Sequence, residues 1–134
     1  MKFWGLVVQF TSVAGLVFAG YQFSVTNTAR QEAVTRERQM KAVDLFIRYN
    51  ELKLNAADRK MDAAEAESRR GMSVALTESI FLLEGDDRGW RATLKGMIVE
   101  EDGPQRQLSV DCATLDDSFE KFAIESVGRN ICTH

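Results

Sequence analysis

The chain has 134 residues, of which 45% are hydrophobic and 28% charged, so it can form one small domain besides any membrane anchor. A single proline favours helices, because a β-sandwich needs a turn about every 8–12 residues. The net charge of −3 is uneven: residues 25–70 carry ten Lys/Arg against eight Asp/Glu, and residues 71–134 carry six against twelve. This acidic distal half argues against a nucleic-acid partner, because a phosphate backbone attracts basic surfaces.

Residues 3–25 contain no charged side chain. As a helix they would be about 34 Å long, enough to cross a hydrocarbon core of about 30 Å. Tyr21 and Phe23 lie at the distal end, where aromatic side chains prefer the headgroup boundary. We therefore predict a transmembrane anchor over residues 1–25. The main alternative is a cleavable signal peptide, since residues 17–19 resemble a cleavage site, but Lys2 is the only charged side chain before the apolar run.

Small residues follow a four-residue spacing along the predicted anchor, at Thr11, Gly15 and Ala19. This spacing places them on one face of a helix, where a neighbouring helix can approach closely. Gln9 and Ser12 can add interhelical hydrogen bonds. We expect this face to bind another membrane helix, although small residues are also common in transmembrane helices that make no such contact.

The positive charges flanking the anchor predict its orientation. Lys2 and the α-amino group precede it, whereas four basic residues follow it, namely Arg30, Arg36, Arg38 and Lys41. By the positive-inside rule, the N-terminus is expected outside and the C-terminal body in the cytoplasm, at the inner (plasma) membrane. Cys112 and Cys132 do not change this expectation, because two cysteines fit either a disulfide in an oxidising compartment or reduced thiols.

A long amphipathic helix is predicted over residues 26–70, which contain no Gly or Pro and are rich in good helix formers. Thr28 and Gln31 have the spacing of a capping box, so either a new helix starts there or the anchor continues through it. Within this helix, residues in alternating three- and four-residue steps form a predicted seam. Its members are Met40, Val43, Ile47, Asn50, Leu54, Ala57 and Met61. The seam suits a partner or a second copy; the alternative is a helix that packs only on its own domain.

Residues 71–134 are predicted to form a small helical cap. Gly71 is expected to end the long helix, and three shorter helices follow over residues 72–84, 89–101 and 114–127. Asp87 is a candidate N-cap, and Gly128 a C-terminal stop. Residues 105–113 alternate like a strand, but a lone strand has no partner, so we expect a short helix or an ordered loop. The predicted fold class is all-α: a transmembrane helix, a long amphipathic helix and a small cap packed on it.

Few residues suggest chemistry. His134 is the only histidine, and with Cys132 it would make a poor metal site because a chain end is a weak scaffold. Asp86 and Asp87 resemble a cation-binding loop only loosely. No phosphate-binding glycine loop and no CxxC pair is present in the sequence. We therefore expect no catalytic residues, no cofactor and no metal.

These features predict a non-catalytic accessory or scaffolding subunit of a larger membrane complex. Its expected partners are the lipid bilayer and other integral membrane subunits, bound through the anchor and the long helix. The alternative is a membrane adaptor or sensor that self-associates through the seam into a homo-oligomer. An anchor followed by a helical tail, with the stretch at residues 44–50, resembles bacterial single-pass proteins in general form, and that resemblance implies no particular activity.

Overall fold

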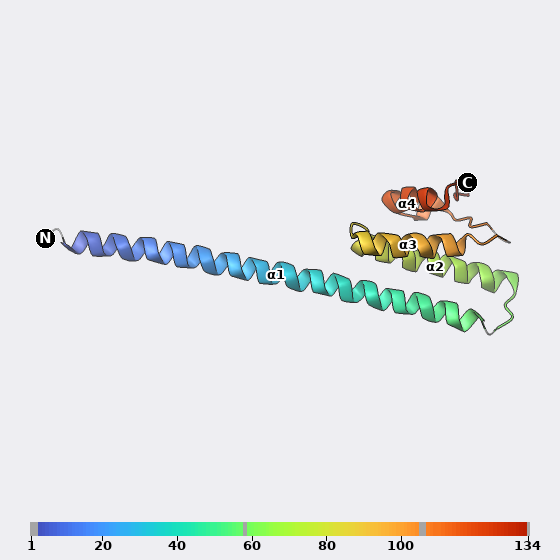
Figure 1. Ribbon diagram of the computed structural model, residues 1–134, viewed down its shortest axis with the longest axis horizontal. Helices are drawn as coiled ribbons and strands as arrows, with labels where there is room; N and C mark the ends of the chain where they lie inside the picture. The colour runs from blue at the N-terminus through green and yellow to red at the C-terminus, as the bar shows by residue number, and fades with distance from the viewer. Residues whose placement is uncertain (1–2, 58, 105–106, 134) are drawn as a thin grey trace. The chain divides into compact units, whose positions relative to one another are not determined.

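The computed structural model describes residues 3–57, 59–104 and 107–133, with side chains described from residue 18 onward. These residues form α1 (Phe3–Ala57), α2 (Ala63–Glu84), α3 (Arg88–Glu101) and α4 (Asp117–Val127), with a short 3-10 helix at Cys112–Thr114 (Figure 1). Within these ranges there is no strand, and an isolated parallel bridge joins Val110 to Cys132. The predicted all-α class is confirmed.

The chain divides into two compact units, Met1–Glu37 and Arg38–His134. In the first unit, α1 runs through residue 28 without a break. The Thr28 hydroxyl donates a hydrogen bond to the Ser24 carbonyl (3.0 Å), so it bonds back along the same helix and does not cap a new one. Of the two outcomes left open by the capping-box pattern, the continuous helix is the one observed.

The predicted membrane anchor falls largely outside the described side chains. No helix among the described residues contains a stretch long and apolar enough to cross a membrane. The side chains of residues 3–17 lie outside the described part, and they include Gln9, Thr11, Ser12 and Gly15 of the predicted contact face. Ala19 is described and exposed. The anchor and its contact face therefore stay predictions.

The predicted helix over residues 26–70 is wrong at its C-terminal end. α1 ends at Ala57, and α2 begins at Ala63 and runs through the expected stop at Gly71. The cause lies at Asp62, whose extended backbone and side chain cap α2 by accepting a hydrogen bond from the Glu65 N–H (2.7 Å). The Asp62 carboxylate satisfies a free N–H group at the start of α2. A new helix therefore begins here, and α1 and α2 take the place of the single predicted helix.

The limits of α3 and the end of α4 agree with the sequence. Asp87 caps α3 by accepting a hydrogen bond from the Trp90 N–H (2.9 Å), and α3 ends at Glu101 as expected. α4 begins at Asp117, a few residues later than predicted, because Asp116 is its cap. Gly128 ends it with a φ of 78°, a left-handed conformation that glycine adopts without strain. α2 and α3 form an antiparallel hairpin, against which α4 packs (Figure 1).

The core lies among α2, α3, α4 and the last part of α1. Its centre is fully buried, with Ile80, Leu94, Ile98 and Phe119 all at 0% exposure. Phe81 stacks on Phe122 with ring centroids 5.0 Å apart, joining α2 to α4. α1 contributes the buried side chains of Ala42 and Tyr49, with Leu45 and Phe46 packed against the same cluster.

The chain end folds back on the segment before α4. The Val110 N–H donates to the Ile131 carbonyl (2.9 Å), and the Thr133 N–H donates to the Val110 carbonyl (2.8 Å). Cys112 and Cys132 form a disulfide, with Cα atoms 5.2 Å apart. Residues 107–111 are thus an ordered segment, as expected, but the expectation that an extended segment here would lack a pairing partner is wrong.

Candidate functional site

One face of α1 within the second unit is apolar and uncovered. Four side chains are exposed there at three-, four- and seven-residue steps: Met40 (73%), Val43 (48%), Ile47 (50%) and Leu54 (69%). We call these four residues the α1 stripe. On another face of the same helix, Ala42 and Tyr49 are buried in the core at 0% and 2% exposure. The helix therefore uses one side for its own domain and leaves the other without an intramolecular cover among the described residues.

The rotation of α1 about its axis is fixed by a buried acid at the end of α3. The Tyr49 hydroxyl donates a hydrogen bond to Oε1 of Glu101 (3.2 Å), and Lys53 Nζ lies 2.6 Å from the same oxygen. Glu101 is only 8% exposed, so its charge needs these partners. Turning α1 to bury the stripe would break both contacts. The buried acid would then be unpaired, which costs about 3–5 kcal/mol.

Most of the predicted seam lies on this exposed face. Asn50 is exposed within it, and its amide donates a hydrogen bond to the Phe46 carbonyl one turn earlier (2.9 Å). Ala57 is exposed at the end of the helix. Met61 is a correction: it lies beyond α1, half-buried, with its sulfur 3.3 Å from Arg69 Nη1. Because α1 ends at Ala57 and α2 begins at Ala63, Met61 does not belong to the seam.

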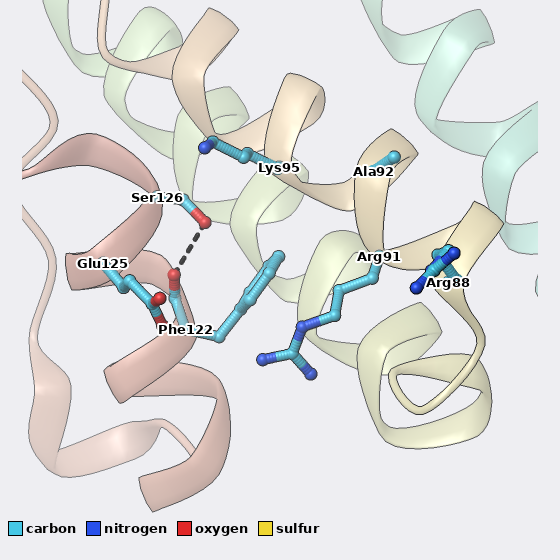
Figure 2. A pocket seen from close by; sticks show the side chains of 7 residues that line it. All are labelled: Arg88, Arg91, Ala92, Lys95, Phe122, Glu125 and Ser126. Atoms are coloured by element: carbon cyan, nitrogen blue, oxygen red, sulfur yellow. Dashed lines mark hydrogen bonds between the residues drawn. The ribbon is translucent and has the colours of Figure 1, made fainter.

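A basic groove of about 280 Å³ lies between α3 and α4 (Figure 2). α3 contributes Arg88, Arg91 and Lys95 at three- and four-residue steps, and Glu125 lies on the α4 side. The Arg91 guanidinium is 5.1 Å from the ring centre of Phe122, and it also donates a hydrogen bond to the Gly85 carbonyl (3.1 Å). Arg91 is therefore engaged in packing the helices together. This cluster was not predicted from the sequence, although the three- and four-residue spacing of Arg88, Arg91 and Lys95 is visible there.

A larger groove of about 490 Å³ lies between α2 and residues 109–115. Two of its carboxylates are engaged by backbone groups: Glu78 accepts a hydrogen bond from the Asp116 N–H (2.6 Å), and Asp111 accepts one from the Ala113 N–H (3.1 Å). These acids order the turn before α4. Such fixed capping roles suit a structural groove better than proton transfer, which requires a carboxyl positioned towards a substrate.

Three potential metal ligands lie close together, since the ligand atoms of Cys112, Glu120 and Cys132 are all within 4.8 Å of one another. Both sulfurs are joined in the disulfide, and a metal binds a thiolate rather than a disulfide sulfur. The two cysteines therefore form a covalent cross-link. The three residues would offer a metal three ligands only after the disulfide is reduced.

Arg129 also links the C-terminal segment to the residues that follow α3. Its guanidinium pairs with the Asp102 carboxylate and donates a hydrogen bond to the Leu108 carbonyl (2.9 Å). Burial by itself raises the pKa of Asp102, but the hydrogen bond from the Leu108 N–H (2.7 Å) and the charge of Arg129 outweigh it. The net effect is a pKa below the usual range, so the pair is charged at neutral pH.

Comparisons with protein-family models, with curated proteins and with solved structures find no match to this chain. The class that the geometry itself defines is an all-α chain with an uncovered apolar helix face and a disulfide-closed C-terminus.

Proposed function

We propose that this chain is a membrane-anchored, non-catalytic accessory subunit that docks on other integral membrane subunits. Docking uses the predicted transmembrane helix together with the α1 stripe. The observation that carries the proposal is the stripe itself: Met40, Ile47 and Leu54 are at least half exposed on a helix whose rotation Glu101 fixes. An apolar helix face held in the solvent is typical of a surface that another protein covers.

The anchor is supported by the end of the uncharged run that the structure describes. Phe18, Tyr21, Phe23 and Val25 are each more than half exposed on α1. Large apolar and aromatic side chains uncovered on more than one side of a helix are costly in water and favourable at a bilayer boundary. The proposed location is therefore the inner (plasma) membrane.

The free energy available explains why the anchor and the stripe would act together. Covering the exposed fractions of the four stripe side chains yields roughly 4–7 kcal/mol, at about 1.5–3 kcal/mol for each complete side chain. Association of two free molecules costs about 4–15 kcal/mol in lost motion. The stripe alone would bind weakly. A helix that is already held in the same bilayer as its partner loses less freedom when it binds. The anchor therefore raises the effective concentration of the stripe at its partner.

A non-catalytic role is supported by what the groove side chains do. Arg91 packs on aromatic rings, whereas Glu78 and Asp111 cap backbone N–H groups. These three side chains thus have structural partners, and we propose no substrate for the grooves.

A second function, self-association, is favoured by one residue. Asn50 is exposed on the same face as the stripe, between Ile47 and Leu54. An amide is both donor and acceptor, so two copies in register can pair their Asn50 side chains across a coiled coil. Replacement of Asn50 by Ile should tighten or re-register a self-made coiled coil, but only perturb a helix docked on a different subunit.

The test is cross-linking in intact membranes with a photoreactive amino acid at Leu54. Asn55 is the matched control, because it is exposed on the next residue of the same helix but lies off the stripe. Adducts with other membrane proteins at Leu54 and none at Asn55 support the accessory subunit, whereas adducts with a second copy support self-association. Equal labelling at both positions, together with migration as a monomer in native electrophoresis, would contradict both.

A further inference from the structure

The disulfide uses every cysteine of the chain. The sequence contains two cysteines, and Cys112 and Cys132 are bonded to each other across 20 residues. Both are partly buried, Cys112 in the 3-10 helix before α4 and Cys132 in the segment after it. The bond therefore closes a loop that contains the whole of α4.

Contacts independent of the sulfur atoms bring the two cysteines together. Val110 is hydrogen-bonded to both Ile131 and Thr133, which flank Cys132. Leu108 and Ile131 are buried at 0% and 2% exposure, so the two segments also share a core contact. Arg129 bridges Asp102 and the Leu108 carbonyl. The folded backbone thus holds the cysteines at bonding distance, which favours a disulfide formed on folding over an accidental surface bond.

The surroundings of the bond suit a structural disulfide. Oε1 of Glu120 lies 3.7 Å from Sγ of Cys132. Reactive cysteines are exposed and have basic neighbours that stabilise the thiolate, whereas a carboxylate repels it. Exchange with other thiols is disfavoured here because it requires that thiolate.

We propose that the body, Arg38–His134, folds and works in an oxidising compartment outside the cytoplasm, with the N-terminus on the cytoplasmic side. Structural disulfides persist in such compartments and are rare in the cytosol. In the formation step, the two thiols lose two protons and two electrons as the S–S bond forms, and a disulfide of an exported thiol oxidase is reduced to a dithiol. The partner of the α1 stripe would then be an exported segment of another membrane protein.

This orientation is opposite to the one that the flanking charges predict. The positive-inside rule counts short segments near the anchor, and here it compares Lys2 on one side with Arg30, Arg36 and Arg38 on the other. The disulfide depends on the whole folded body. A body in the cytosol would have no oxidant to maintain the bond, so the disulfide favours the exported side.

The first test measures the thiols of the full chain inside a bacterial host. Cells are quenched with acid, and the chain is labelled with a maleimide-linked polymer before and after reduction. In a normal host we expect no label before reduction and two labels after it. In a host that lacks its periplasmic thiol oxidase, we expect the chain to be labelled already before reduction. Two labels before reduction in the normal host would overturn the proposal.

The second test reads the compartment without the cysteines. In spheroplasts, protease added from outside should degrade the body of both the unmodified chain and the Cys112→Ser/Cys132→Ser variant, while a cytosolic control protein stays intact. A protected body in both chains would overturn the proposal. The inferred position of the N-terminus on the cytoplasmic side rests on the proposed anchor, whereas the inferred oxidising compartment does not. A disulfide-bonded chain found in the soluble exported fraction would support the compartment and contradict the anchored function.

Discussion

The phenol of Tyr49 in α1 donates a hydrogen bond to Glu101 at the end of α3, with the two oxygens 3.2 Å apart. Burial, followed by the charges of Glu101 and Glu100, raises the pKa of Tyr49 well above its usual value. Because the folded pKa exceeds the unfolded value of about 10, the stabilisation is complete below pH 10 and is lost as the pH rises above it. The relationship links the position of α1 to the charge state of one side chain.

We predict that Tyr49→Phe lowers the free energy of unfolding by about 1–2 kcal/mol at neutral pH, because a hydrogen bond to a charged group is removed. The measurement is denaturant unfolding of the full chain in detergent. The variant should also lose part of the decline in stability above about pH 10. Asp44→Asn is the control, since Asp44 and Arg48 form an exposed ion pair worth less than about 1 kcal/mol. Equal losses in the two variants would contradict the role assigned to Tyr49.

Replacing Ile47 by Glu should separate docking from folding. Ile47 is half exposed, so we expect the free energy of unfolding to change by no more than about 0.5 kcal/mol. Binding should fall strongly, because a charge would enter an apolar contact. Co-purification from gently solubilised membranes measures the loss, with Asn55→Glu as the matched control. If Ile47→Glu and Asn55→Glu retain the same partners, the stripe is not the docking face.

Removal of the disulfide should destabilise the body measurably. For a 20-residue separation, the loss of loop constraint in the unfolded chain corresponds to about 3 kcal/mol. Cys112→Ser/Cys132→Ser is expected to show this loss in denaturant unfolding without reductant. The unmodified chain should approach the variant when reductant is added. A variant as stable as the oxidised chain would mean that the noncovalent contacts of Val110 and Arg129 suffice.

The Asp102–Arg129 pair predicts acid sensitivity. The folded pKa of Asp102 lies below its unfolded value of about 3.9, because the Leu108 N–H and the Arg129 charge outweigh the effect of burial. Its stabilising contribution, about 1–3 kcal/mol, is therefore present above about pH 5 and is lost as the pH falls through the folded pKa. Asp102→Asn should lower stability at neutral pH and flatten the acid limb of the stability profile. If the variant loses stability at acid pH as steeply as the unmodified chain does, other carboxyl groups cause that loss.

The basic groove offers a matched pair of arginines. Arg91 contacts the rings of Phe81 and Phe122 and donates a hydrogen bond to the Gly85 carbonyl, whereas Arg88 lies at the exposed start of α3. We predict that Arg91→Ala costs about 1–2 kcal/mol in unfolding free energy through lost cation–π and packing contacts. Arg88→Ala should change it by no more than about 0.5 kcal/mol. Thermal or denaturant unfolding distinguishes them, and equal effects would refute the structural role of Arg91.

The sequence predicted the features that depend on local signals. The caps at Asp87 and Gly128 and the limits of α3 follow from short-range hydrogen bonding and from backbone freedom. The heptad spacing from Met40 to Leu54 also predicted which face of α1 is apolar. The prediction of one helix over residues 26–70 was wrong because uninterrupted helix formers do not show where one helix ends and the next begins. Asp62 followed by Glu65 was the local signal against it.

Long-range relationships were beyond the sequence pattern. Nothing in the residues before α4 indicates that Val110 would pair beside Cys132, because this contact depends on how α4 folds the chain back. The pairing of Glu101 with Tyr49 and Lys53 joins residues about 50 apart, and periodicity along one helix carries no information about the end of another. For the same reason, the sequence left the state of the cysteines open.

The disulfide also determines what a single backbone cut would release. α4 lies entirely between Cys112 and Cys132, so a protease that cleaves once between them produces two peptides that remain one covalent molecule. The fragment carrying most of the chain and the fragment carrying the C-terminus would separate on a gel only after reduction. A nicked chain could thus keep its core helices assembled, and damage to this region would be visible only under reducing conditions.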